Sequence, residues 1–252
     1  MDIAAFFGLI IGISAIVGGN IIEGGSTSHL LQFAAALIVL GGTFGATLLS
    51  FSLRDMLNAF KALGFVFGNN SQSTSEVVAD ILGVLVKARK MGLIAMENEI
   101  GKMDNEFLKK GLTLVVDGMP PSTVKEVLYQ EITTYEENMK NAADVFGAAG
   151  GYAPTIGILG AVLGLIHVMG NISDPSKIGS GIAVAFVATI YGVGLANLFR
   201  LPVARKIMNR VKEEVFLREL IIEGVIGVES GVNPYFLKTR LNAFLSEHER
   251  AR

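Results

Sequence analysis

Residues 148–169 read AAGGYAPTIGILGAVLGLIHVM and contain no Asp, Glu, Lys or Arg. At about 1.5 Å per residue, a helix of this length crosses a hydrocarbon core of roughly 30 Å. Three further apolar stretches of similar length cover residues 3–22, 30–51 and 179–201, with Arg200 at the very end of the last. The sequence therefore predicts an all-α, polytopic membrane protein with four transmembrane helices and a helical cytoplasmic domain.

Composition excludes several classes of protein. Of the 252 residues, 51% are hydrophobic and 17% are charged, against about 25% charged in soluble domains. The net charge of −2 gives no sign of nucleic-acid binding. The chain has no Cys, and no His cluster, phosphate-binding loop or credible catalytic triad is evident. We therefore predict no enzymatic activity, no cofactor and no metal.

The basic residues fix the orientation. Of 21 Lys and Arg residues, Lys177 alone lies in a loop between the first two or the last two apolar stretches. The others lie between the second and third stretches or from Arg200 onward, which the positive-inside rule makes cytoplasmic. Both termini are then predicted to be cytoplasmic.

This layout divides the chain into four parts. Transmembrane helices 1 and 2 occupy residues 1–52, and a cytoplasmic helical domain occupies 53–147. Transmembrane helices 3 and 4 occupy 148–202, and a cytoplasmic helical tail occupies 203–252. Helix breaks are expected at Gly92, at the turn of residues 117–121 and at the Gly- and Pro-containing residues 229–234.

Small residues recur at four-residue spacing in three of the apolar stretches. The pairs are Gly8 and Gly12, Gly41 and Gly45, and Gly160 and Gly164. Such spacing lets helices approach closely. It suits packing within one subunit and also contact with other subunits, so both interpretations stay open.

The apolar stretches lack a carboxylate, which an ion pathway through a membrane usually requires. They offer hydroxyls, amides and the lone imidazole of His167, with Thr189 and Tyr191 among the hydroxyls. If the chain takes part in ion flow, the carboxylate must belong to a partner chain.

Two further features each allow a structural and a functional interpretation. Pro154 and Pro202 remove helical donors from the carbonyls of Gly150 and Leu198, which gives either a tolerated kink or a hinge. Lys90 and Glu97 are seven residues apart and are expected on one helix face, with Arg89 on a neighbouring face. These charges form either solvated surface or a patch that binds a protein.

Together these elements resemble the MotA/PomA family, the A subunit of the bacterial flagellar stator. The resemblance covers essentially the whole chain. Its most specific parts are residues 153–166, APTIGILGAVLGLI, and residues 183–192, AVAFVATIYG, followed by Asn197 and Pro202. Residues 89–97, RKMGLIAME, are similar to the cytoplasmic motif with which the family engages the rotor.

The resemblance implies a ring of five copies in the bacterial inner membrane around a dimer of a B subunit. That partner would contribute one membrane helix per chain with an essential Asp, and would bind peptidoglycan. Arg89, Lys90 and Glu97 would contact the switch-complex protein of the rotor.

The resemblance also implies roles within the membrane. Pro154 and Pro202 match prolines that couple ion flow to rotation. Thr189, Ala161 and Tyr191 would line the ion route. Ala161 stands where sodium-driven relatives usually carry Thr, which favours protons as the coupling ion.

A related alternative is an energising subunit of an outer-membrane transport system, of the ExbB/TolQ type. Those proteins share the last two helices and the dependence on a partner carboxylate, but typically have three membrane helices. Four apolar stretches and the rotor-like charges favour the stator. A solitary channel or transporter should show an intramembrane charge or a broken-helix site, and neither is evident.

Overall fold

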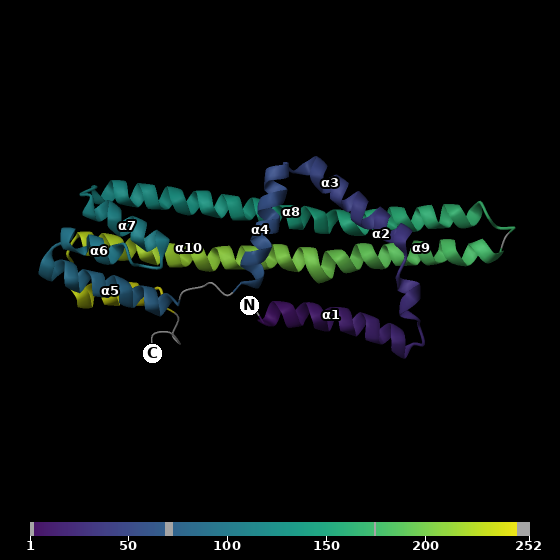
Figure 1. Cartoon of the computed structure of the whole chain (residues 1–252), viewed down its shortest axis with the longest axis horizontal. Helices are drawn as coiled ribbons and strands as arrows, with labels where there is room; N and C mark the ends of the chain where they lie inside the picture. Colours follow the sequence, from purple (N-terminus) through teal and green to yellow (C-terminus); the bar gives the residue numbers. More distant parts are fainter. Residues whose placement is uncertain (1–2, 69–72, 174, 246–252) are drawn as a thin grey trace. The chain divides into compact units, whose positions relative to one another are not determined.

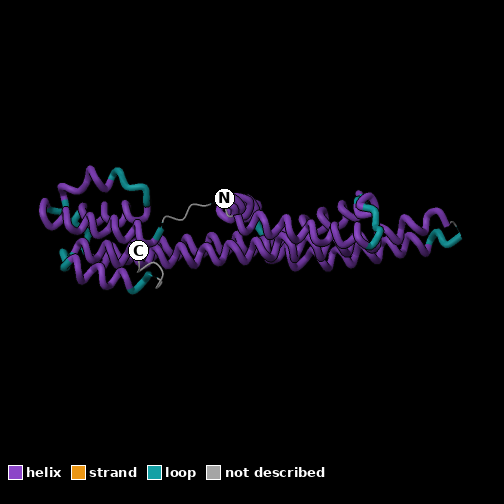
Figure 2. The backbone as a smooth tube through the Cα atoms, turned by 90° about the horizontal axis from the view of Figure 1, so that it is seen from below, coloured by secondary structure: helices purple, strands orange, loops and turns teal. Residues whose placement is uncertain are grey.

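The computed structural model describes residues 3–68, 73–173 and 175–245. Across these ranges the chain forms helices and no strand, as Figure 2 shows. Four of the helices are long and apolar enough to cross a membrane. The prediction of an all-α, polytopic membrane protein is therefore confirmed.

The described residues fall into two compact units, each assembled from two separate parts of the chain. The first unit consists of residues 1–69 and 139–209, and the second of residues 70–138 and 210–252. Two long helices, α8 (Pro121–Met169) and α10 (Leu201–Glu229), contribute residues to both units (Figure 1).

The first unit contains the apolar stretches. Besides parts of α8 and α10, its elements are α1 (Ile3–Ile22), η1 (Thr27–Leu30), α2 (Phe33–Ala36), η2 (Leu37–Gly41), α3 (Gly42–Ser50), α4 (Leu53–Phe67), α9 (Pro175–Gly194) and η4 (Leu195–Arg200). The elements η2 and η4 are short π-helical segments inside longer helices. Such segments take up an extra residue in the helical ladder and often mark functional positions.

Glycines bring α8 and α9 into close contact, and the two helices lie side by side in Figure 1. A Cβ placed on Gly192 would lie 2.5 Å from the carbonyl oxygen of Ala153. A Cβ on Gly164 would lie 2.8 Å from the backbone of Gly181 and Ala185. The pair Gly160 and Gly164 therefore packs within the chain, whereas Gly41 and Gly45 face open space.

Helix α4 follows the second apolar stretch and opens the segment 53–147 that the sequence predicts to be helical. Ser52 and Asp55 close a capping box at its start, because each side chain accepts from the backbone N–H of the other. Met56, Ala59 and Ala62 bury one face of the helix. Leu53 and Phe60 are exposed on the other face.

The second unit is a bundle of amphipathic helices around one apolar core. Its elements besides parts of α8 and α10 are α5 (Thr74–Met91), η3 (Ile94–Met96), α6 (Glu97–Ile100), α7 (Glu106–Val116) and α11 (Pro234–Asn242). Ile81, Leu128, Leu220 and Leu237 are fully buried in this core. Burial of such side chains is the main stabilising contribution to a bundle of short helices.

The charged side chain of Arg218 lies at the edge of this core. The Arg218 guanidinium carbon lies 4.1 Å from the Tyr135 ring centre and 5.0 Å from the Phe107 ring centre. Its Nε donates to Glu214 at 2.8 Å, one helical turn away. Burial, together with the charge of Glu214, raises the pKa of Tyr135 to about 12, although Arg218 acts in the opposite direction.

Candidate functional site

The two prolines singled out in the sequence lie on segments that contact each other. Pro154 is in the interior of α8, and the carbonyl that it deprives of a donor belongs to Gly150. A Cβ on Gly150 would lie 2.7 Å from the Leu201 side chain and 3.5 Å from Arg200. Leu201 directly precedes Pro202, so both interruptions of the helical ladder occur at one place in the first unit.

The helix leading to Pro202 is π-helical. The N–H of Leu201 donates to the carbonyl of Ala196, five residues back, instead of to a carbonyl four residues back. Pro202 has no N–H, so the ladder is interrupted immediately after this widened turn. Asn197 lies in the same segment and donates its side-chain amide to the Val193 carbonyl at 2.9 Å. Two irregularities of the helical ladder therefore follow each other directly.

Thr189 lies at a close contact between α8 and α9. A Cβ placed on Gly157 would come within 3.5 Å of the Thr189 Cα. The Thr189 hydroxyl donates to the Ala185 carbonyl at 3.2 Å and is half-buried. Ala161 is half-buried one turn beyond Gly157 on α8. The two predicted pathway residues thus flank one glycine-lined contact between the helices.

Tyr191 joins α9 to the start of the second apolar helix. Its hydroxyl donates to the Leu30 carbonyl at 2.5 Å and accepts from the Gln32 N–H at 3.4 Å. The ring packs beside a small buried cluster that includes Ala35 and Val39. The hydroxyl is therefore held by backbone partners far away in the sequence.

Two threonines of α3 are the buried polar residues of the described chain. Thr47 donates to the Thr43 carbonyl at 2.7 Å, one turn back. Thr43 Oγ1 is enclosed and has no hydrogen-bond partner among the described residues. The sequence shows that both hydroxyls lie in an apolar stretch, but it does not show that they are buried.

The charges proposed for rotor contact lie in the second unit, at the end of α5 and the start of α6. Arg89 and Lys90 are exposed in the last turn of α5, and Glu97 is exposed as the first residue of α6. The expectation that Lys90 and Glu97 share one helix face is wrong. Gly92 ends α5 with a φ of 84°, in the left-handed region, and a 3-10 turn follows.

Side chains that sequence reasoning missed hold this region in place. Lys87 pairs with Glu99 at 2.6 Å and so ties α5 to α6. Arg89 donates to the carbonyl of Val232 at 3.2 Å, which connects α5 to the segment before α11. No local pattern could identify these partners, because the second pair is 143 residues apart in the sequence.

Comparison with known proteins gives consistent matches along the chain. Residues 99–220 match the MotA/TolQ/ExbB proton channel family, and residues 6–92 match the motility protein A N-terminal family. Motility protein A of Bacillus subtilis is 34% identical over 251 residues, covering 99% of this chain and 93% of the relative. Chemotaxis protein PomA of Vibrio alginolyticus is 33% identical, covering 100% and 98%.

Solved structures agree with the sequence relatives. The structure of C. jejuni MotAB aligns with a TM-score of 0.92 at 30% identity, covering 98% of this chain and 97% of the solved one. The flagellar MotAB stator complex from Bacillus subtilis aligns with a TM-score of 0.91 at 32% identity, covering 98% of each chain.

The family that matches residues 99–220 is a class of membrane proteins that includes both stator and ExbB/TolQ proteins. The N-terminal match and the full-length relatives separate the two, since they name motility proteins. The chain belongs to the motility protein A family. This membership favours the stator prediction over the ExbB/TolQ alternative.

Proposed function

We propose that this chain is the A subunit of a flagellar motor stator, which couples inward ion flow to torque on the rotor. Its membership in the motility protein A family carries the proposal, because the relatives span the whole chain. It is a force-generating membrane component and not an enzyme. We place it in the bacterial inner membrane with both termini in the cytoplasm, as the distribution of basic residues indicates.

The B subunit supplies the membrane carboxylate that this chain lacks. The two aligned structures are of MotAB complexes, and the four apolar stretches here contain no carboxylate. An ion crossing the membrane beside this chain therefore needs an acidic group on a neighbouring helix. We propose a dimer of a single-span, peptidoglycan-binding partner with one membrane Asp per chain, surrounded by five copies of this chain.

The contact between α8 and α9 is the proposed site of ion coupling. Thr189 and Ala161 flank it, and Tyr191 follows on α9 with its hydroxyl anchored to the backbone near Leu30. A hydroxyl at position 161 would replace part of the hydration shell of sodium, whereas a proton needs no such cage. Ala161 thus supports protons as the coupling ion.

The two helices that carry the prolines transmit force from the membrane helices to the second unit. Pro154 and Pro202 lie on segments in contact through Gly150 and Leu201, and both belong to helices that continue into the second unit. Changes at this hinge would be transmitted to the exposed charges Arg89, Lys90 and Glu97. These charges would engage the switch-complex protein of the rotor.

Deletion of the gene in the source organism tests the proposal. We expect cells that still assemble flagella but do not swim, with motility restored by the wild-type gene. A motile deletion strain that has lost energy-dependent uptake across the outer membrane would overturn the stator assignment and favour the ExbB/TolQ type.

A further inference from the structure

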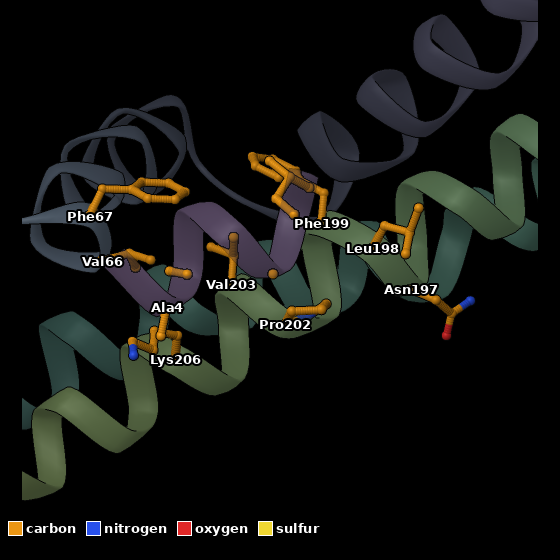
Figure 3. Close-up of a pocket in the computed structure, with 12 residues that line it drawn as sticks. Ala4, Val66, Phe67, Asn197, Leu198, Phe199, Pro202, Val203 and Lys206 are labelled. Carbon is orange, nitrogen blue, oxygen red and sulfur yellow. The ribbon is translucent and has the colours of Figure 1, made fainter. Parts of the chain in front are cut away.

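A groove in the first unit adjoins the proposed hinge but has no ligand or partner assigned to it above. It lies between the start of α1, the end of α4 and the segment from Asn197 to Lys206, as the close-up in Figure 3 shows. Its volume is about 380 Å³, in the range of ligand-binding clefts. Its lining is mostly apolar: Gly8 lies on one wall, Phe67 on another, and Pro202 and Val203 on the third.

The groove straddles the cytoplasmic end of the fourth apolar stretch. Asn197 and Lys206 are nine residues apart, which corresponds to about 13 Å of helix. Asn197 lies within that stretch, whereas Lys206 lies five residues beyond its last residue, Leu201. Lys206 is the basic residue of the lining, and it lies at the end that the positive-inside rule makes cytoplasmic.

We propose that this groove binds an anionic phospholipid of the cytoplasmic leaflet, with one acyl chain along the apolar walls and the phosphate at Lys206. Basic residues beside membrane helices on the cytoplasmic side bind anionic lipid headgroups. Lys206 already has a polar partner within the chain. Its ammonium carries three N–H donors, so it can donate to a phosphate as well.

The lipid would also contact the proposed hinge. Pro202 and Leu198 line the groove, and Leu198 belongs to the π-helical segment that precedes the proline. A bound acyl chain would fill space into which this segment could otherwise bend. The inference rests on membrane insertion and orientation, and it does not depend on the proposed ion coupling.

The test is native mass spectrometry of the full chain with its co-purified partner, exchanged into nanodiscs of equal phosphatidylglycerol and phosphatidylcholine. Gly8→Leu would fill the groove, because a Cβ at Gly8 meets no atom within 4 Å. Gly19→Leu is the matched control, because Gly19 is also exposed on α1 and equally open but does not line the groove. Lys206→Gln tests recognition of the headgroup.

We expect the wild type and Gly19→Leu to retain phosphatidylglycerol, and Gly8→Leu to retain it several-fold less. Lys206→Gln should lose the preference for phosphatidylglycerol over phosphatidylcholine. Equal lipid retention by Gly8→Leu and the wild type would overturn the proposal.

Discussion

At the scale of single residues, Arg89 links the structure of the second unit to its proposed contact with the rotor. Its side chain is exposed and donates one hydrogen bond, to the Val232 carbonyl. A hydrogen bond of this kind contributes about 0.5–1.5 kcal/mol to stability. Charge reversal should therefore affect recognition of a partner far more than folding.

We expect Arg89→Glu to abolish or strongly reduce swimming, while membrane insertion and co-purification with the partner stay at wild-type levels. The stability of the purified chain should change by roughly 1 kcal/mol or less. Lys125→Glu is the control, because it reverses an exposed charge on α8 in the same unit. Loss of assembly by Arg89→Glu would assign this residue to structure instead of rotor contact.

Glu229, the last residue of α10, predicts a pH dependence of stability. One carboxylate oxygen is enclosed without a hydrogen-bond partner among the described residues, and burial raises the pKa of the group. A carboxyl whose pKa is raised in the folded state favours folding when protonated. Its contribution is complete below the unfolded pKa and is lost as the pH rises through the folded pKa.

Glu229→Gln should therefore raise the unfolding temperature at neutral pH and have little effect in acid. Thermal unfolding of the purified protein between pH 4 and pH 8 measures this difference. Glu219→Gln is the control, because Glu219 is exposed on the same helix. A variant whose advantage over the wild type shrinks with rising pH would contradict the assignment.

Residue chemistry could be predicted from sequence only in part. The absence of a membrane carboxylate was visible directly, because it depends on composition. The burial of Thr43 and the hydroxyl bonds of Tyr191 were not, since both depend on how distant segments meet. The Lys87–Glu99 ion pair could not be predicted either, because its two residues lie on different helices, on either side of the helix break at Gly92.

At the scale of elements, the interior proline of α8 gives a test in which stability and function move in opposite directions. Pro154→Ala supplies the N–H donor that the Gly150 carbonyl lacks. Ala is about 3 kcal/mol more favourable than Pro in a helix interior. We expect a chain that is at least as stable as the wild type but whose motor turns more slowly.

Tethered-cell rotation and thermal unfolding measure the two effects. Pro121→Ala is the control, because Pro121 opens α8 at a position where no helical donor is required. Wild-type rotation by Pro154→Ala would rule out the hinge and leave this proline as a tolerated kink.

The contact between α8 and α9 predicts a large effect of a single methyl group. A Cβ on Gly192 would lie 2.5 Å from the Ala153 carbonyl oxygen, a backbone atom that cannot move aside independently. Overpacking of this kind costs about 1–3 kcal/mol. Gly192→Ala should lower the unfolding temperature measurably, whereas Gly41→Ala should not, because Gly41 faces open space. Equal stability of the two variants would show that the helices separate easily.

The apolar stretches were the best predicted elements, because length and hydropathy define a membrane helix. Helix α8 runs without a break from Pro121 to Met169 and therefore joins a cytoplasmic helix to the third apolar stretch. Helix α4 lies within residues 53–147, which were predicted to be helical, but its own bounds were not assigned. The π-helical segments have no sequence signal apart from the proline that follows one of them.

At the scale of the whole molecule, the proposed function requires a partner chain, the B subunit. The chain has four membrane helices without a carboxylate, two prolines in contacting segments, and exposed charges at one helix junction. These features are expected of one subunit of a two-component complex. In the proposed function, the membrane features act together with an acidic helix of the partner, and the exposed charges act on a rotor surface. The matched solved structures are of two-component complexes, which agrees with this dependence.

Native mass spectrometry of the detergent-solubilised chain, co-expressed with the product of the neighbouring gene, tests this claim most directly. The account predicts one complex with five copies of the 26.8 kDa chain and two copies of a single-span partner that carries a membrane Asp. A chain that purifies alone and conducts ions by itself would contradict the account, because the missing carboxylate would then not be needed.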